Sequence, residues 1–128
     1  MGKKIVTIGF TLAIAISTII ILWWYYGFFS NYNYFTAKRD IKYGNVQFIT
    51  FGLLLPSSKD KEIDIVATKY GFKGSNIGCT VTTQEINAIE IYNNVVEQYL
   101  SIRNGKNWRI NYQREIDSLY KIAFDQDK

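Results

Sequence analysis

The chain has 128 residues, an apolar share of 48% and a formal net charge of +4, which allows one small domain with a single core. It contains no histidine and a single cysteine, Cys79. This excludes histidine-based catalytic and metal sites, structural zinc and an intramolecular disulfide. Lys3 and Lys4 supply half of the net charge, and residues 30–128 are too evenly charged to form a nucleic-acid-binding surface. We therefore expect no nucleic-acid partner, no cofactor and no enzymatic activity.

Residues 5–29 form a run of 25 residues without a charged side chain, preceded by a basic flank at residues 1–4. At ~1.5 Å per residue, a helix of that length exceeds the ~30 Å hydrocarbon core of a bilayer. A cleaved signal peptide is the alternative, because Ala13 and Ala15 resemble a cleavage site. The run is, however, about twice as long as the apolar region of about 7–15 residues that signal peptides carry. We therefore expect an uncleaved, single-pass transmembrane helix.

Aromatic residues crowd the end of this run, with nine of the chain's 21 between residues 23 and 35. Trp and Tyr favour the headgroup level of a bilayer, where the ring is sheltered and its polar atom stays hydrated. The predicted membrane-interface residues are Trp23, Trp24, Tyr25 and Tyr26, in a belt that extends to about residue 35. An aromatic platform for a ligand is the alternative interpretation.

The flanking cations bear on orientation. Lys3 and Lys4 lie directly against the N-terminal end of the helix and favour a cytoplasmic N-terminus. Lys38, Arg39 and Lys42 lie near the other end and almost cancel that preference. The nearer pair leads us to expect an inner-membrane protein whose C-terminal domain is periplasmic.

Small residues recur every four positions within the apolar run, at Gly9, Ala13 and Ser17. Such a face allows two helices to approach closely in lipid. The pattern also arises easily by chance in apolar helices. It identifies a candidate helix-packing face and makes a homodimer through the transmembrane helix one hypothesis.

The tethered domain is expected to begin with a β-hairpin. Its first arm would cover about residues 36–43 and its second arm residues 46–55, which are rich in β-branched and aromatic residues and end at Pro56. Gly44 and Asn45 suit a two-residue hairpin turn between these arms.

A helix is expected next. Ile63, Val66, Ala67 and Tyr70 form one apolar stripe, and Gly71 is placed to close the helix in the left-handed conformation. Ser57 or Ser58 could cap the start of this helix, and Asp60, Glu62 and Asp64 suit its positive end.

The residues from Gly74 to Gly78 predict a turn, followed by a short apolar strand at 77–81. If this strand pairs in parallel with residues 46–55, the helix between them is a crossover connection. Thr82 and Glu85 then form a capping box that opens a helix over 83–103. A last helix is expected over about 108–123, so the sequence predicts an α+β domain over 36–124 and a disordered tail at 125–128.

Candidate functional residues are few. Cys79 is expected to be a buried, small apolar residue of the 77–81 strand, since no histidine is available to activate it. The acidic residues are explained by helix dipoles and caps, so no metal or catalytic site is expected. The candidate ligand or partner contacts are the aromatic residues Tyr92, Tyr99, Trp108 and Tyr112.

The segments YGF…GC and YNN…RNGKNW, within residues 70–79 and 92–108, resemble small single-pass membrane proteins of Gram-negative bacteria. The resemblance covers most of the tethered domain and implies a location in the bacterial envelope. It implies no activity, ligand or catalytic residue.

The function expected from the sequence is protein–protein interaction by a membrane-anchored domain, for example as an accessory subunit of a membrane complex with a membrane or envelope protein as partner. The alternative is a tethered module that binds a small ligand or an envelope polymer. That alternative predicts a concave aromatic pocket near the four candidate aromatic residues.

Overall fold

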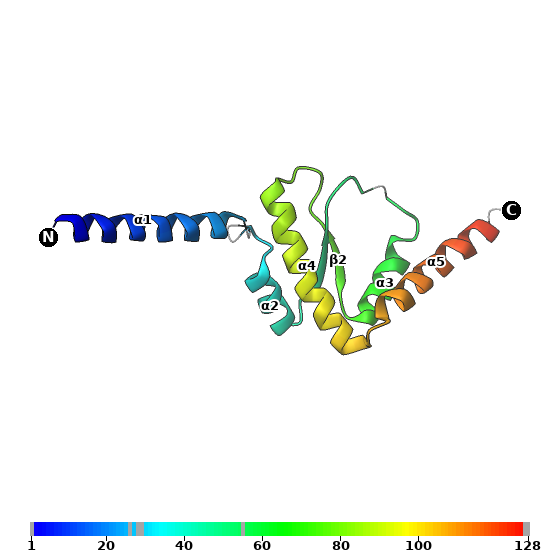
Figure 1. The fold of residues 1–128 in the computed structure, drawn as a ribbon. Helices are drawn as coiled ribbons and strands as arrows, with labels where there is room; N and C mark the ends of the chain where they lie inside the picture. Colours follow the sequence, from blue (N-terminus) through cyan, green and yellow to red (C-terminus); the bar gives the residue numbers. More distant parts are fainter. Residues whose placement is uncertain (1, 26, 28–29, 55, 127–128) are drawn as a thin grey trace.

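The computed structural model describes residues 2–25, 27, 30–54 and 56–126 of the chain. Within them, five helices and a two-stranded sheet form an N-terminal helix followed by a small α+β domain (Figure 1). This confirms the predicted fold class in outline. The elements in chain order are α1 (Gly2–Tyr25), α2 (Tyr34–Lys42), β1 (Gln47–Thr50), α3 (Asp60–Tyr70), β2 (Lys73–Asn76), α4 (Thr83–Asn104) and α5 (Trp108–Gln126).

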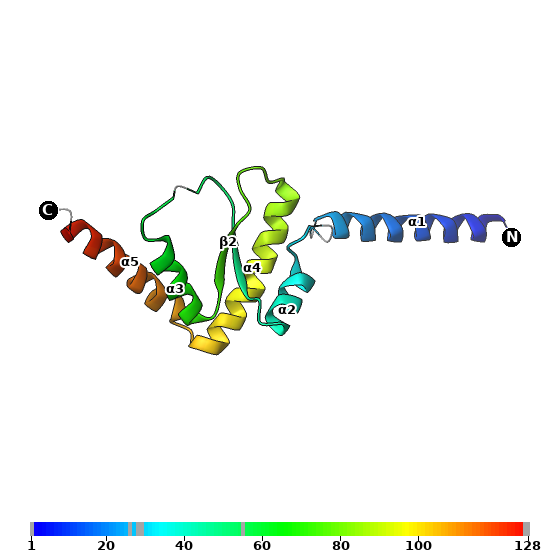
Figure 2. The ribbon, with the colours of Figure 1, turned by 180° about the vertical axis from the view of Figure 1, so that it is seen from behind.

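Helix α1 projects away from the domain, and both views show it on the side opposite to α5 (Figures 1 and 2). Its segment Val6–Tyr25 has 20 residues and a mean hydropathy of 2.3, and none of it is buried against the rest of the described chain. By length and composition this helix could cross a membrane, as an anchor or as a signal sequence.

Gly27, in the connection between α1 and the domain, packs against α4. Gly27 is buried with φ of 63°, and its amide donates to the Trp24 carbonyl at 3.2 Å. A Cβ at Gly27 would lie 2.5 Å from Cβ of Ala88 on α4, so only glycine fits this approach. Six residues on, Asn33 is 6% exposed and donates its side-chain amide to the Ser30 carbonyl at 3.0 Å.

The predicted hairpin is wrong, because residues 34–42 form helix α2. Asn33 caps this helix: its Oδ1 accepts from the Phe35 and Thr36 amides at 2.9 and 3.1 Å. The Thr36 hydroxyl in turn accepts from the Asn33 amide at 2.8 Å, which completes a capping box. Gly44, with φ of 72°, follows the end of α2 and so terminates a helix rather than turning a hairpin.

The two strands pair in parallel, with Gln47 opposite Lys73, and α3 is the crossover between them. The strand predicted at 46–55 is therefore shorter, and the strand predicted at 77–81 and the turn predicted at 74–78 are wrong. Backbone hydrogen bonds explain where the second strand begins and ends. The Lys73 amide donates to the Val46 carbonyl and the Ile77 amide to the Thr50 carbonyl, both at 3.0 Å, so β2 starts almost directly after α3.

Helix α3 ends at Gly71 as predicted, with a left-handed φ of 91°. Its N-cap is Lys59, so the predicted serine cap is wrong. Ser57 instead donates its amide to Oδ2 of Asp60 at 3.1 Å. Lys69 and Tyr70 at the other end of α3 both donate to Glu115 of α5 at 2.8 Å, which joins the two helices.

Helix α4 forms the centre of the core. The predicted capping box is confirmed, since the Thr82 amide donates to Glu85 Oε2 at 2.8 Å and the Glu85 amide to the Thr82 hydroxyl at 3.3 Å. The helix packs on the sheet and on α2, and Ile86 in its first turns is half-buried. Its buried residues are Ala88, Ile89, Tyr92, Val96 and Leu100.

The last helix, α5, extends through Gln126, beyond its predicted end and into the tail predicted to be disordered. Residues 125 and 126 are therefore helical, and residues 127–128 lie outside the described part of the chain. Trp108, at the start of α5, is 2% exposed and belongs to the core cluster.

Replacing Gly27 by alanine should disrupt its packing on α4. The added methyl group would clash with Ala88, and the alanine would have to keep the positive φ of residue 27. We therefore expect the free energy of unfolding to fall by about 2–4 kcal/mol. Thermal unfolding of the full chain in detergent measures this. Gly44→Ala is the control, because Gly44 also has a positive φ but nothing within 4 Å of its Cβ position. Equal losses in the two variants would contradict the described packing.

Candidate functional site

Aromatic rings from β1, α3, α5 and the connection that follows α3 meet beside the sheet. The Phe72 ring lies 5.8 Å from the rings of Phe48 and Trp108 and 5.3 Å from Tyr112, measured between centroids. Tyr70 adds an edge-to-face contact with Tyr112 at 5.6 Å. These separations are typical of favourable aromatic pairs, so the rings form one packed cluster.

A cavity of about 230 Å³ opens beside this cluster. Its walls combine apolar rings with an arginine, a glutamine and a strand glycine. Phe48 and Gly74 are directly opposite each other in the sheet register, which places both on the cavity side. The lining residues are Phe48, Thr50, Phe72, Gly74, Trp108, Arg109, Tyr112 and Gln113.

Arg109 supplies the positive charge of the cavity. Its guanidinium carbon lies 5.1 Å from the centre of the Phe48 ring and 5.4 Å from that of Trp108. Glu97 on α4 accepts hydrogen bonds from Nε of Arg109 at 3.1 Å and from Nη2. The guanidinium is thus held between an ion pair and two aromatic faces, with its remaining donors available to a bound group.

The other wall carries the Tyr112 phenol. Its partial burial, and next the Asp64 carboxylate, raise the pKa of Tyr112 above the ordinary tyrosine value. This phenol is therefore neutral at physiological pH. The cavity accordingly offers apolar ring surface, one cation and neutral polar groups at its rim.

Of the four predicted contact residues, Trp108 and Tyr112 line the cavity and Tyr92 and Tyr99 do not. Tyr99 is half-buried against the core. The sequence analysis missed Arg109 as a cavity residue, although it follows Trp108 directly. Phe48 and Phe72 could not be assigned to a shared site, because strand pairing brings them together.

Tyr92 has a structural role. It is fully buried, and its hydroxyl donates to Asp40 Oδ2 of α2 at 2.8 Å. Its ring makes an edge-to-face contact with Tyr32 at 5.5 Å. Burial, followed by the hydrogen bond to the Asp40 carboxylate, raises the pKa of Tyr92 far above the ordinary value. Tyr92 therefore ties α2 to α4.

Cys79 is exposed, and the prediction that it is a buried strand residue is wrong. It follows Gly78 in the connection from β2 to α4, where no strand packs over it. Across the described residues, no group of three or more acidic or cysteine side chains could hold a metal ion.

The predicted membrane-interface residues Trp23, Trp24 and Tyr25 form the last turn of α1 and are 47%, 59% and 63% exposed. Tyr26, the fourth, lies outside the described residues. Gly9, Ala13 and Ser17 lie along α1 at exposed positions, and nothing comes within 4 Å of a Cβ built at Gly9. Their role in helix packing stays a prediction.

Comparison with known proteins adds no relative: no family model matches the chain, and no curated protein or solved structure is significantly similar to it.

Replacing Tyr92 by phenylalanine should lower the free energy of unfolding at neutral pH by about 1–2 kcal/mol, through loss of its bond to Asp40. Because the pKa of Tyr92 is raised in the folded state, its contribution is complete below the unfolded value of about 10 and declines as the pH rises above it. The difference in unfolding free energy between wild type and Tyr92→Phe should therefore become smaller above pH 10. Chemical denaturation at several pH values would measure this difference. Tyr43→Phe, at a side chain 75% exposed, should change stability by less than about 0.5 kcal/mol. A pH-independent gap would contradict this account.

Proposed function

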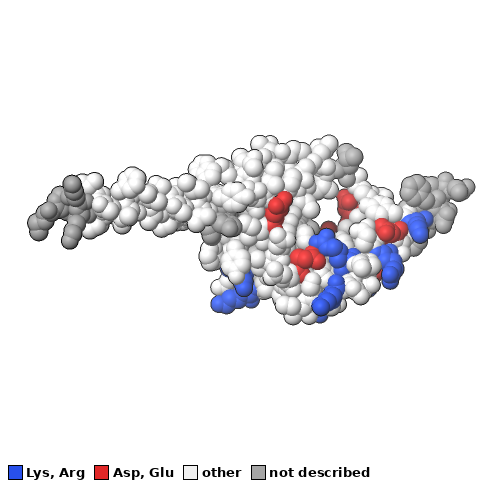
Figure 3. Space-filling model, in the orientation of Figure 1, with Lys and Arg blue, Asp and Glu red and all other residues white. Residues whose placement is uncertain are grey.

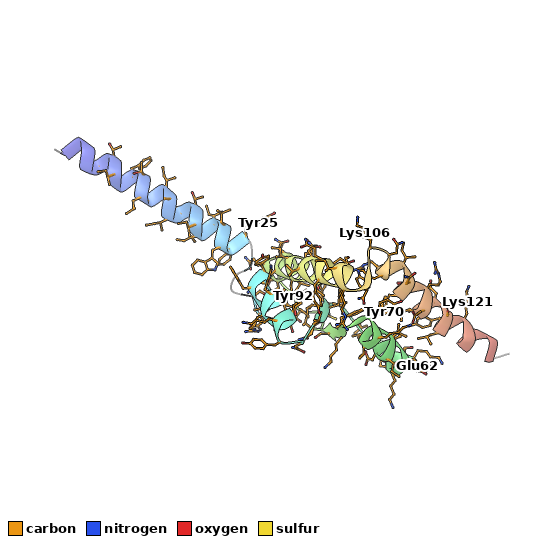
Figure 4. The ribbon with its side chains drawn as sticks, turned by 90° about the horizontal axis from the view of Figure 1, so that it is seen from below. Tyr25, Glu62, Tyr70, Tyr92, Lys106 and Lys121 are labelled. Carbon is orange, nitrogen blue, oxygen red and sulfur yellow. The ribbon has the colours of Figure 1, made fainter. Side chains whose placement is uncertain are left out.

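We propose that the chain is a single-pass membrane protein that uses its cavity to bind a side chain of another protein, in a binding role rather than as an enzyme. The observation that carries this proposal is the position of the cavity relative to α1. Tyr70, whose ring contacts Tyr112 of the cavity wall, lies on the α5 side of the domain, whereas Tyr25 marks the opposite end (Figure 4). A partner could therefore reach the cavity while α1 is embedded in lipid.

The size of the cavity favours a side chain of a protein as its occupant. Pockets for drug-sized ligands typically have about 300–1,000 Å³, and this cavity has about 230 Å³. Its composition also fits an interface, since aromatic residues and arginine dominate binding energy where proteins meet. Arg109 favours an acidic or aromatic side chain as the inserted group.

The anchoring part of the proposal rests on the exposed apolar surface of α1. Val6, Phe10 and Ile21 are each more than 60% exposed, and the whole segment Val6–Tyr25 is without burial in the domain. Such a surface is unfavourable in water and stable in lipid, where Trp23 and Trp24 suit the headgroup level. Together with the basic flank, this supports an inner-membrane location with the domain on the periplasmic side, and a membrane or envelope protein as partner.

A second candidate function follows from the same cavity. A small planar anion could occupy it alone, stacked on Trp108 and paired with Arg109. This corresponds to a tethered ligand-binding module. We place this function second, because the cavity is smaller than typical pockets for free ligands.

The anchor predicts that the chain stays in the membrane without cleavage. In bacterial expression, we expect it to remain in the membrane pellet after carbonate extraction, with the intact mass of 14.9 kDa. A periplasm-active reporter at the C-terminus should be active, and a cytoplasm-active one silent. A soluble product shortened by 15 or more residues would show that the apolar run is a signal peptide.

Filling the cavity should abolish partner binding without unfolding the domain. Gly74 suits this, because nothing lies within 4 Å of a Cβ at that position. A photoreactive residue at Gln113, on the cavity rim, should give a discrete protein adduct in intact cells. We expect that adduct to weaken progressively through Gly74→Ala, Gly74→Val and Gly74→Leu, by at least tenfold in the last.

The control variant is Thr80→Val, an exposed position outside this cavity, which should leave the adduct unchanged. Thermal unfolding of each variant separates loss of binding from loss of the fold. If the adduct persists in a folded Gly74→Leu protein, the cavity is not the binding site.

A further inference from the structure

Helix α2 has two chemically different sides. At about 100° per residue, positions 36, 37, 40 and 41 cover one side and positions 34, 35, 38, 39 and 42 the other. The first side packs on α4: Ala37 is 0% exposed, and Asp40 and Ile41 are half-buried. The second side is exposed along its length, and we refer to it as the α2 face. Its residues are Tyr34, Phe35, Lys38, Arg39 and Lys42.

The α2 face combines three cations with aromatic rings. Nζ of Lys38 lies 5.3 Å from the centre of the Tyr34 ring, and the Arg39 side chain is 63% exposed. Asp40, the one acidic residue of α2, points to the other side, where it accepts from Tyr92. Among the described residues, the one ion pair that these three cations form is the 3.5 Å contact between Nε of Arg39 and Oδ1 of Asp40. Three of the 13 basic residues after residue 30 are thus concentrated on one short helix.

The position of α2 relates this charge to the anchor. α2 begins nine residues after the end of α1, and Gly27, between the two helices, is buried against Ala88 of α4. In Figures 1 and 2, α2 lies on the side of α4 from which α1 projects. The blue side chains over α2 in Figure 3 lie below the point where α1 leaves the domain, on the same side of the molecule. A bilayer crossed by α1 would therefore lie against this side.

We propose that the α2 face binds the anionic phospholipid headgroups of the membrane that α1 crosses. The proposal rests on the anchoring proposed above. Lys38, Arg39 and Lys42 would pair with lipid phosphates, and Tyr34 and Phe35 would enter the interfacial region, as aromatic rings do at bilayer surfaces. α1 and α2 would then hold the domain at two points, with the cavity on the side away from the lipid.

The occupant is a lipid surface rather than a protein for two reasons. The first is reach, since the anchor already holds this face beside the headgroups. The second is charge: near an anionic surface each cation increases the docked population about fivefold, so three cations make a large combined contribution. An exposed face with no carboxylate directed outward matches a continuous anionic surface.

The test uses the full chain, isotope-labelled, in lipid nanodiscs that contain a gadolinium-chelate headgroup lipid. Two compositions are compared: phosphatidylcholine alone, and phosphatidylcholine with one third phosphatidylglycerol. In the anionic discs, paramagnetic relaxation of the amides of residues 38–42 should exceed that of residues 109–121 at least fivefold. Removal of phosphatidylglycerol, or addition of 0.5 M salt, should reduce this excess at least threefold.

The decisive variant is Lys38→Gln/Arg39→Gln/Lys42→Gln, which should reduce the excess as removal of phosphatidylglycerol does. Lys61→Gln/Lys73→Gln/Lys106→Gln, which neutralises three exposed cations elsewhere, should leave it unchanged. The amides of residues 23–25 report anchoring separately. Strong relaxation there together with none at α2, or an α2 signal insensitive to lipid charge and to the first variant, would overturn the proposal.

Discussion

The contact between α4 and β1 is the constraint on which the domain depends. A two-stranded sheet is marginal on its own, and a parallel one is stable only when covered. Asn93 of α4 supplies what a third strand would provide at the free edge of β1. Its Oδ1 accepts from the Ile49 amide at 2.9 Å, and its Nδ2 donates to the Ile49 carbonyl at 2.8 Å. Ile49 itself is 2% exposed, so this position combines apolar burial with satisfied backbone polar groups.

Helix α4 also connects the end of α1 with the start of α5. Near its start, Ala88 contacts Gly27 and so receives the end of α1. Near its end, Ser101 accepts from Nε1 of Trp108 at 3.1 Å, which places the first turn of α5 beside the sheet. With 22 residues, α4 spans roughly 33 Å. One continuous helix thus contacts both the connection that follows α1 and the first turn of α5, beside the aromatic cavity.

The parts of the fold predicted correctly are those specified by local sequence. The capping box at Thr82 and Glu85, the apolar period of α4 and the glycine that ends α3 each act within a few residues. The failures occurred where a local pattern was ambiguous or absent. Gly44 suits a hairpin turn and a helix end equally well, and β2 is a polar strand that pairs through its backbone, with no apolar alternation to reveal it.

The cavity was only partly predictable for a related reason. Trp108 and Tyr112 share a helix face, which the sequence shows, so they were identified together. Phe48 and Phe72 are 24 residues apart and meet through the parallel register of β1 and β2. The prediction that Cys79 is buried was wrong for a different reason. Apolar residues lie near it in the sequence, but no other part of the described structure covers its side chain.

The packed connection between α1 and the domain gives the proposed function a thermodynamic advantage. A domain on a long flexible linker loses orientational freedom when it binds, and that loss opposes association. Here Gly27 is buried against α4, and the bond from Asn33 to the Ser30 carbonyl and the capping box of α2 fix the start of α2 before any partner arrives. In the proposed arrangement, the cavity is presented at a set height and direction above the membrane. A partner anchored in the same membrane would diffuse only in the plane of that membrane and would meet the domain in a fixed orientation. A cavity that accepts one side chain could then suffice for specific binding.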